Sequence, residues 1–591
     1  MVSILGSGAL HLSLVDLVPS LSDRLRLLYP DRTDEALAAI ESEFADLLSE
    51  PPPAQPDGPT WDERDAVLIT YADQVRDSGS GKSPLAALRE WLLAEGLDQA
   101  LSTVHLLPFC PYTSDDGFSV VDYLAVDPES GTWDDIAALG ERFDLMYDLV
   151  LNHISQASEW FEAYKRGEAP YDRFFLECDP DLDYSEVVRP RSLPLLTPVE
   201  TSRGERHVWT TFSADQIDLN YGEPLVMARM LRILVEYARR GARIVRLDAV
   251  TYLWKRLGTN CVHLEETHEA VKLMRDVLAA LAPRTLVLTE TNVPHKENIS
   301  YFGGMDSGDG QKGDEAHMVY NFSLPPLLLE AFLSGDATAI RDWLTNLDPP
   351  PEGCTFFNFT ASHDGVGVRP LEGLVSDERL SALVEAVEKR GARINTRRQS
   401  DGSDTPYELC LTYFSALAPD APDEELHVRR FLASQAVMLA LKGMPAVYFH
   451  SLVGTPNDTA GADTSGIHRR INRRKYERGE LDGALSEGAT QRHVLEGMSE
   501  LLTKRRAEPS FHPEAEQRVV DTANPAVLAF ERTSASGVRI LVVVNFSESD
   551  QQMALPTDFS GDAVDLITNS PLASQKELHL AAGQVVWLSP R

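Results

Sequence analysis

Short apolar runs alternate with amphipathic stretches along most of the chain. The runs are rich in Val, Ile, Leu and Phe and too short for helices, so they predict β-strands. Segments between them, such as 224–241 and 267–283, space their apolar residues as α-helices do. This β–α alternation predicts a closed (β/α)8 barrel; a doubly wound open sheet is the alternative, weakened because no glycine-rich loop follows the first strand. The predicted barrel strands occupy 66–73, 103–109, 144–152, 243–250, 284–290, 317–322, 354–364 and 445–451.

Breaks in this alternation predict the domain organisation. Residues 1–60 have helical spacing at 34–50 and then a proline-rich linker, so we expect an N-terminal helical extension. The barrel would occupy 61–511, with insertions at about 154–211 and 365–421 that are too long for one helix. Long insertions at strand ends usually carry function. Apolar alternation after 511 predicts a C-terminal antiparallel β domain over 512–591.

Composition narrows the choice of partners and compartment. The 591 residues carry a formal charge of −37, which argues against nucleic acid and anionic membranes as partners. No apolar run approaches the ~20 residues of a membrane span, and the N-terminus lacks the basic start of a signal peptide. The five cysteines are scattered without metal-ligand spacing, so we expect reduced thiols in the cytoplasm. We see no cage of oxygen ligands for calcium and expect neither a metal nor an organic cofactor.

Acidic residues lie at the ends of three predicted strands and suggest the chemistry. Asp248 follows Arg246 by two positions, so both side chains point to one side of a strand, where the guanidinium favours an ionised carboxylate. Glu290 ends an apolar strand, where burial would raise its pKa and suit it to donate a proton. Asp364 follows His363 and could hold sugar hydroxyls. Two carboxyl groups in one cleft can break a glycosidic bond. Structural ion pairs and a turn-forming Asp are the alternative interpretations.

Four segments that hold these residues resemble the signature segments of the α-amylase superfamily, glycoside hydrolase family 13. They are DLVLNH, RIVRLDAV, VLTETN and ASHDG, and QIDLNY at 216–221 resembles an additional motif of that family. The resemblance implies that Asp248 is the nucleophile, Glu290 the acid/base and Asp364 the stabiliser of the transition state. It also implies supporting roles in the sugar subsite for Arg246, His153 and His363.

Further segments are similar to the sucrose phosphorylase subfamily. They are LITYAD, VHLLPF, DDGFSVVDY, RPRSLPLLTP, FSLPPLLL and INRRKY. This resemblance implies that Asp115 and Arg473 bind the far hydroxyls of one glucosyl unit, and that Arg191 and Tyr407 lie on loops near phosphate and acceptor. It also implies a glucosyl-Asp intermediate that phosphate attacks to give α-glucose 1-phosphate. A phosphate dianion needs cationic donors, and Arg191, Arg397 and Arg398 of the two insertions are candidates.

The sequence also bears on the identity of the acceptor. The N-terminal extension and the segments at 207–221, 261–268, 289–303 and 401–409 resemble glucosylglycerate phosphorylases more than sucrose phosphorylases. Glycerate carries a carboxylate, which an arginine near the acceptor would fit. Glucosylglycerol, sucrose and sucrose 6-phosphate stay open as alternative donors. A hydrolase or transglucosidase on the same scaffold, and a non-catalytic sugar-binding protein, are the other functional interpretations. The expected partners are a small glucoside and inorganic phosphate.

Overall fold

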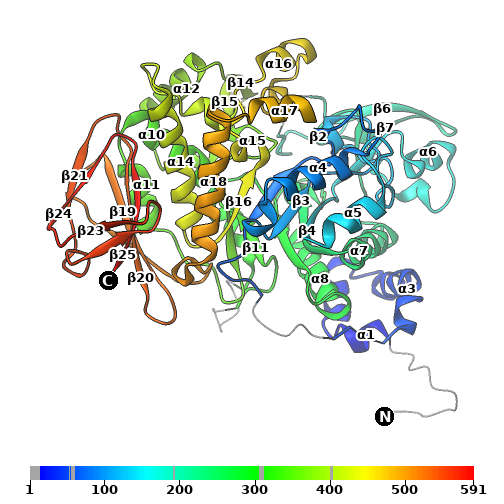
Figure 1. Cartoon of the computed structure of the whole chain (residues 1–591). Coiled ribbons are helices and arrows are strands. Elements are labelled where there is room, and N and C mark those ends of the chain that lie inside the picture. Colours follow the sequence, from blue (N-terminus) through cyan, green and yellow to red (C-terminus); the bar gives the residue numbers. More distant parts are fainter. Residues whose placement is uncertain (1–12, 52, 55–59, 191–192, 305–311, 399–403) are drawn as a thin grey trace.

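A closed barrel of eight parallel strands forms the centre of the protein (Figure 1), as the computed structural model shows. The structure describes residues 13–51, 53–54, 60–190, 193–304, 312–398 and 404–591. Each barrel strand overlaps a strand predicted from the sequence, and two of them begin one residue before the predicted start, so the predicted (β/α)8 fold is confirmed. The strands are β1 (Val67–Thr70), β3 (Thr103–Leu106), β4 (Asp144–Val150), β9 (Ala242–Asp248), β10 (Leu286–Thr289), β11 (Met318–Tyr320), β12 (Thr355–Phe359) and β16 (Met444–Tyr448).

Helices surround the barrel, and three of them begin at a capping side chain. The Ser83 side chain accepts the Ala86 N–H at the start of α4, and Thr132 forms a capping box with Asp135 at the start of α5. The side chain of Asp423 caps α14 in the same way. The main outer helices are α4 (Pro84–Ala94), α5 (Trp133–Gly140), α7 (Pro224–Arg239), α8 (Glu265–Leu281), α9 (His295–Ile299), α10 (Leu324–Ser334), α11 (Thr338–Thr345), α14 (Glu424–Ala440), α15 (Phe449–Leu452) and α18 (Thr490–Arg506).

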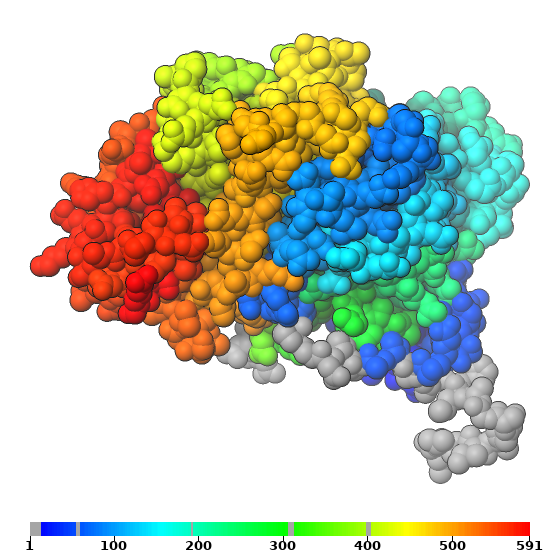
Figure 2. All heavy atoms as spheres, viewed as in Figure 1, coloured from blue at the N-terminus to red at the C-terminus, as the bar shows by residue number. Residues whose placement is uncertain are grey.

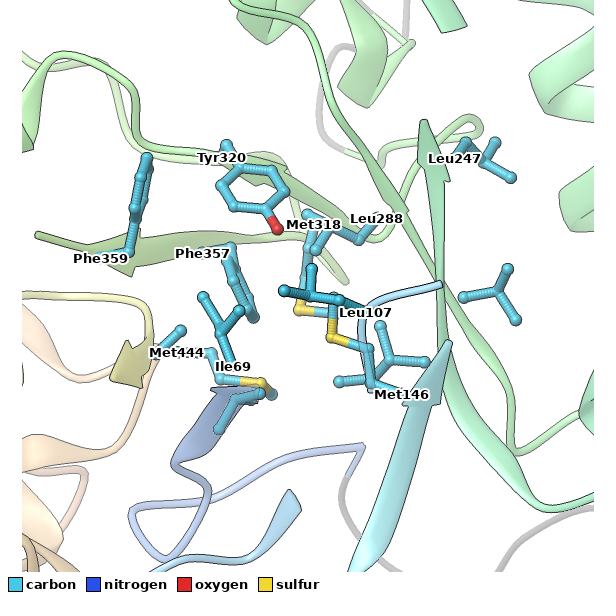
Figure 3. Close-up of a cluster of buried hydrophobic side chains, with 14 of the residues drawn as sticks. Ile69, Leu107, Met146, Leu247, Leu288, Met318, Tyr320, Phe357, Phe359 and Met444 are labelled. Carbon is cyan, nitrogen blue, oxygen red and sulfur yellow. The ribbon is translucent and has the colours of Figure 1, made fainter. Parts of the chain in front are cut away.

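Apolar side chains fill the barrel and make it a packed core with no pore. Ile69, Met146, Met318 and Phe357 come from four different strands and meet in its interior (Figure 3). Leu247 points away from the barrel interior, toward the outer helices. Strands buried on both faces need near-continuous apolar sequence, which explains why the barrel strands read as apolar runs. The polar residues that interrupt the runs are therefore concentrated at the strand ends.

Two insertions rise from the carboxyl ends of β4 and β12. The first holds β5 (His153–Ser155), α6 (Glu159–Arg166), β6 (Leu196–Thr201), β7 (Gly204–Trp209) and β8 (Gln216–Asp218). The second holds β13 (Val366–Gly367), α12 (Asp377–Lys389), β14 (Arg393–Arg398), β15 (Asp404–Cys410) and α13 (Tyr413–Ala416). After β16 come α16 (Thr459–Ser465), the 3-10 helix η8 (His468–Asn472), α17 (Arg478–Ala484) and β17 (Tyr476–Glu477), which pairs with β2 (Val75–Arg76). These segments surround the barrel end where active sites form.

The C-terminal residues form the predicted antiparallel β domain. Its main sheet has the order β18–β19–β20–β25–β22–β23, and a separate pair of strands, β21 and β24, lies beside it. It packs beside α14 and α18 at one end of the molecule, red in Figure 2. The strands are β18 (Glu516–Val520), β19 (Val527–Thr533), β20 (Arg539–Asn545), β21 (Gln551–Ala554), β22 (Ala563–Asp565), β23 (Ser570–Leu572), β24 (Glu577–Leu580) and β25 (Val585–Pro590).

The predicted N-terminal helices pack on the outside of the barrel. They are α1 (Leu14–Leu17), α2 (Leu21–Leu28) and α3 (Thr33–Glu43), and they contact α7 and α8. Arg24 pairs with Glu269 at 2.8 Å, and Arg229 with Glu43 at 3.0 Å. Most of the proline-rich linker lies outside the described residues. Among the helices that the structure describes, we find none long and apolar enough to cross a membrane.

Candidate active site

A pocket opens at the carboxyl ends of the barrel strands and contains most of the predicted site residues. Counting the part that is open to solvent, its empty space is about 820 Å³. Residues from strand ends and from both insertions line it, so the barrel supplies the floor and the insertions the walls. The lining residues are Asp115, Phe118, His153, Pro190, Phe212, Gln216, Arg246, Asp248, Ala249, Thr251, Tyr252, Glu290, Thr291, Asn292, Val293, His363, Asp364, Tyr407, Glu408 and Arg469.

Strand β9 places Arg246 and Asp248 on the pocket floor. Arg246 Nη1 donates to Asp248 Oδ1 at 2.8 Å and also pairs with Asp148 of β4. The guanidinium lies 5.6 Å from the centre of the Tyr320 ring, a cation–π distance. Arg246 therefore holds Asp248 by Oδ1, which leaves Oδ2 to face a substrate.

Glu290 follows β10 directly and joins Asp248 in the pocket. Its Oε2 accepts the backbone N–H of Ala249 at 3.0 Å and lies 3.9 Å from Arg246 Nη2. Ala249 has φ of +50°, a left-handed conformation that a non-glycine residue rarely adopts, and this turn aims its N–H at Glu290. The one N–H bond to Oε2 leaves Oε1 to carry a proton.

Burial raises the pKa of both Asp248 and Glu290 above their ordinary values. The Arg246 guanidinium opposes both shifts, while the charge of Glu290 adds to the shift of Asp248 and the charge of Asp364 adds to that of Glu290. The raised pKa that we expected for Glu290 agrees with its burial in the structure. For Asp248 we expected the charge of Arg246 to keep the carboxyl group ionised. That charge does lower the pKa of Asp248, but burial raises the pKa by more. Arg246 contacts Asp248 at 2.8 Å and Glu290 at 3.9 Å, so its charge favours an ionised Asp248 more than an ionised Glu290.

The pKa of Asp364 is shifted downward, opposite to the shifts of Asp248 and Glu290. Burial alone would raise the pKa of its carboxyl group, but Arg469, His363 and Arg473 together hold that pKa well below its usual range. Arg469 Nη1 lies 2.5 Å from Asp364 Oδ1, as an ion pair and not as an aligned hydrogen bond. Oδ1 is buried against this guanidinium, so the ion pair favours the ionised form of the carboxylate.

The two predicted histidines lie in the pocket and are neutral. His153 Nε2–H donates to the Phe118 carbonyl at 2.8 Å, and Asn152 Nδ2 lies 3.2 Å from its Nδ1. The ring of His363 stacks on Phe118 with centroids 4.7 Å apart. Burial lowers the pKa of both rings, that of His363 to about 3. A neutral imidazole has a single N–H, and that of His153 is used by Phe118, so of the two rings His363 is the one that can donate to a sugar hydroxyl.

Arg473 differs from its expected position. Asp115 lines the pocket, but Arg473 lies behind the wall, where Nε donates to the His363 carbonyl at 2.7 Å and Nη1 to Asp116 Oδ2 at 2.7 Å. Its Nη2 comes within 3.6 Å of Asp364 Oδ1. In this structure Arg473 therefore supports the subsite through Asp364 and Asp116.

The predicted phosphate and acceptor residues are only partly in place. Tyr407 lines the pocket. Arg397 is half-buried on β14 and is not a lining residue, although its charge acts on the Tyr252 hydroxyl, whose pKa is raised mainly by burial. Arg398 ends β14, and its side chain lies outside the described part of the chain, as does the whole of Arg191. The structure leaves these phosphate roles as predictions.

Several lining residues were not predicted from the sequence. Arg469 and Glu408 form a buried ion pair, and Gln216 donates to the Phe118 carbonyl at 3.1 Å. Arg469 lies two positions before INRRKY, whereas Gln216 and Glu408 lie inside segments already singled out, QIDLNY and 401–409. Among the described residues no group of three or more His, Cys, Asp or Glu could hold a metal ion.

Comparison with known proteins agrees with this geometry. A model of the α-amylase catalytic domain matches residues 99–348, and one of the maltogenic amylase C-terminal domain matches 517–587. The crystal structure of sucrose 6F-phosphate phosphorylase from Thermoanaerobacter thermosaccharolyticum aligns with a TM-score of 0.70 at 24% identity, over 82% of this chain and 94% of that one. The chain belongs to the α-amylase superfamily, glycoside hydrolase family 13.

Sequence relatives place it more narrowly. Glucosylglycerate phosphorylase from Allomeiothermus silvanus is 47% identical over 85% of this chain and 89% of the relative. The Escherichia coli enzyme of the same name is 44% identical over 89% and 92%. Sucrose phosphorylase from Agrobacterium vitis is 31% identical over 77% and 91%. Within its superfamily the chain groups with the sucrose phosphorylase subfamily and resembles the glucosylglycerate phosphorylases most among these relatives, as predicted.

Proposed function

We propose that this protein is a glucosylglycerate phosphorylase. It transfers the glucosyl unit of glucosylglycerate to inorganic phosphate and releases glycerate and α-D-glucose 1-phosphate. The observation that carries the proposal is the step in identity, from 43–47% with glucosylglycerate phosphorylases to 31% or less with sucrose, glucosylglycerol and sucrose 6(F)-phosphate phosphorylases. The pocket supports it with a carboxyl pair of the kind that retaining enzymes use.

In the first step Asp248 and Glu290 act together. Asp248 Oδ2 attacks C1 of the glucosyl unit while the bond from C1 to the glycerate oxygen breaks. Glu290 gives its proton to that oxygen, so glycerate leaves with a neutral hydroxyl. Asp364 is ionised and buried beside the sugar, where its negative charge stabilises the positive charge that develops on the ring.

In the second step phosphate replaces glycerate. A phosphate oxygen attacks C1, the bond to Asp248 breaks, and Glu290 receives the proton that a monoanionic phosphate would release. Two inversions at C1 retain the α configuration. Arg246 holds Asp248 Oδ1 through both steps and disperses the charge that returns to this carboxylate.

Phosphate needs cations that the pocket floor does not offer. Among the described lining residues, five carry carboxyl groups and two carry guanidinium groups. Both guanidinium groups are already paired, Arg246 with Asp248 and Arg469 with Asp364 and Glu408. We therefore assign phosphate and glycerate binding to the insertions, with Arg191, Arg397, Arg398 and Tyr407 as the candidates. The reducing cytoplasm is the proposed compartment, because all five cysteines are free.

The test is glucose 1-phosphate release by the purified protein in phosphate buffer. Glucosylglycerate, glucosylglycerol, sucrose and sucrose 6-phosphate are offered separately at equal concentration. We expect the highest kcat/KM with glucosylglycerate and a linear dependence on phosphate at low concentration. A higher kcat/KM with another donor would transfer the assignment to that donor. Free glucose released at the same rate without phosphate would identify a hydrolase.

A further inference from the structure

Glu408 is a buried carboxylate in the pocket wall that the reaction does not use. It lies on β15, is 2% exposed, and borders the pocket. Its Oε1 accepts the Gly365 N–H at 2.8 Å, and its Oε2 accepts from Asn395 Nδ2 at 2.8 Å. Arg469 meets it as a fork, with Nη2 2.9 Å from Oε1 and Nε donating to Oε2 at 3.1 Å. A side chain with so many donors holds one geometry.

These contacts close a ring around Asp364. Arg469 uses its Nη1 for Asp364 Oδ1 at 2.5 Å while its other nitrogens hold Glu408. Gly365, whose N–H Glu408 accepts, is the next residue after Asp364. A Cβ on Gly365 would come within 2.6 Å of the Glu408 Cγ and of the Leu409 carbonyl, so the Asp364 loop and β15 approach as closely as only glycine allows. Glu408 thus restrains Asp364 in two ways. It accepts the N–H of the neighbouring Gly365, and it holds Arg469, the cation that pairs with Asp364.

The charge of Glu408 would be unfavourable in this pocket wall if the side chain had no structural role. The proposed acceptors are both anions, and the pocket already contains more carboxyl groups than guanidinium groups. A buried charge is costly unless it is paired and hydrogen-bonded, and Glu408 meets both conditions only through the ring. Reacting groups must be held closely, since a shift of ~1 Å can cost ~100-fold in rate. The ring provides such restraint for Asp364.

We propose that Glu408 is a positioning residue that fixes Arg469 and the Asp364 loop, so that Asp364 faces the sugar in the transition state. The proposal rests on the proposed function, because it takes Asp364 to act on the glucosyl ring. It adds a residue that does not touch the reacting atoms but sets the reactivity of one that does.

The first experiment compares Glu408→Gln with Glu531→Gln. Glu531 is a matched control: it is a buried strand carboxylate, 4% exposed, that pairs with Arg518 at 2.7 Å and with Arg539 in the C-terminal domain. For Glu408→Gln we expect kcat to fall about 10- to 100-fold while KM for the donor changes little. The control should keep the wild-type kcat. Equal kcat for the two variants would overturn the proposal.

A double-mutant cycle with Asp364→Asn separates positioning from general weakening of the structure. If Glu408 acts through Asp364, the variant Asp364→Asn/Glu408→Gln should match Asp364→Asn alone within about twofold in kcat/KM. A purely structural loss would multiply onto the effect of Asp364→Asn, and that result would overturn the proposal. Thermal unfolding of each variant, compared with Glu531→Gln, measures the fraction folded for normalising kcat.

Both comparisons are repeated with α-glucosyl fluoride as the donor. This donor carries the glucosyl unit but no acceptor group, so Asp364 and Glu408 act on it whichever natural glucoside the enzyme uses. Failure of wild-type protein to use glucosylglycerate would refute the proposed function alone. Failure of the cycle on α-glucosyl fluoride would refute the role of Glu408 alone.

Discussion

Replacement of Glu290 by Gln tests the assignment of the proton donor. The change keeps the shape of the side chain, and the amide oxygen can still accept the Ala249 N–H that Glu290 Oε2 accepts at 3.0 Å. The proton that Oε1 would carry is lost. General acid catalysis contributes about 10²- to 10⁴-fold, which corresponds to about 2.7 to 5.4 kcal/mol at 1.36 kcal/mol per tenfold. We expect kcat/KM for glucosylglycerate to fall by that factor.

An activated donor should respond differently to the same change. Fluoride leaves α-glucosyl fluoride without a full proton transfer, so we expect glucosylation of Asp248 from this donor to fall less than about tenfold. Phosphate is largely ionised at neutral pH and needs little help from a base in the second step. The assay is stopped-flow or initial-rate release of glycerate and of fluoride by the same enzyme preparation.

The pH profile gives an independent reading of the same residue. Wild-type activity requires a protonated Glu290, whose pKa is raised by burial, so the rate should fall as pH rises through that pKa. It also requires an ionised Asp248, so the rate should fall on the acid side. In Glu290→Gln the alkaline fall that the wild type shows with glucosylglycerate should disappear. Glu330→Gln is the control, since Glu330 is buried, 2.6 Å from Arg379, and outside the pocket. Equal losses for both donors, or an unchanged alkaline limb, would refute the role of Glu290.

Three further predictions concern other residues. Asp248→Ala should lower kcat by at least about 10⁴-fold without loss of folding, as measured by glucose 1-phosphate release and circular dichroism; full turnover would mean that another group is the nucleophile. Arg397→Ala and Arg398→Ala should raise KM for phosphate or for glycerate in the reverse reaction, and unchanged KM values for both would remove these residues from the site. His450 is buried with its pKa lowered by burial from 6.5 to about 3, so the unfolded chain takes up its proton first as pH falls. Its contribution to stability should therefore be complete above pH 6.5 and decline below it by about 1.4 kcal/mol per pH unit. Urea unfolding of His450→Gln should show a shallower decline between pH 6.5 and 4, and an unchanged slope would contradict the reasoning.

The barrel could be predicted because its strands are buried on both faces. That burial forces runs such as 243–250 to be apolar, and Arg246 and Asp248 are conspicuous because they interrupt one. The strand period of two also placed both side chains on one side, where the structure has them 2.8 Å apart. Residues at the ends of such strands were therefore located from sequence alone.

The walls of the pocket could not be predicted in the same way. Arg469 lies on a short 3-10 helix after the last barrel strand and Glu408 on a strand of the second insertion, and neither segment has a period that fixes its place in space. Their pairing depends on long-range packing across 61 residues of chain. Arg473 was assigned to sugar hydroxyls from a motif, but its position behind His363 follows from the same packing.

The barrel floor and the two insertions contribute differently to specificity for the acceptor. The pocket floor is built on barrel strands, where Asp148 joins Arg246 to His105 in a buried network. Both proposed acceptors are anions, yet the cations of the floor and of the wall are neutralised by carboxylates before any acceptor binds. Charge for the acceptor must then come from the two insertions, which can change in sequence without disturbing the barrel core. A change in the insertions can therefore change the acceptor while the barrel stays the same, which agrees with relatives of this chain being named for glucosylglycerate, glucosylglycerol and sucrose.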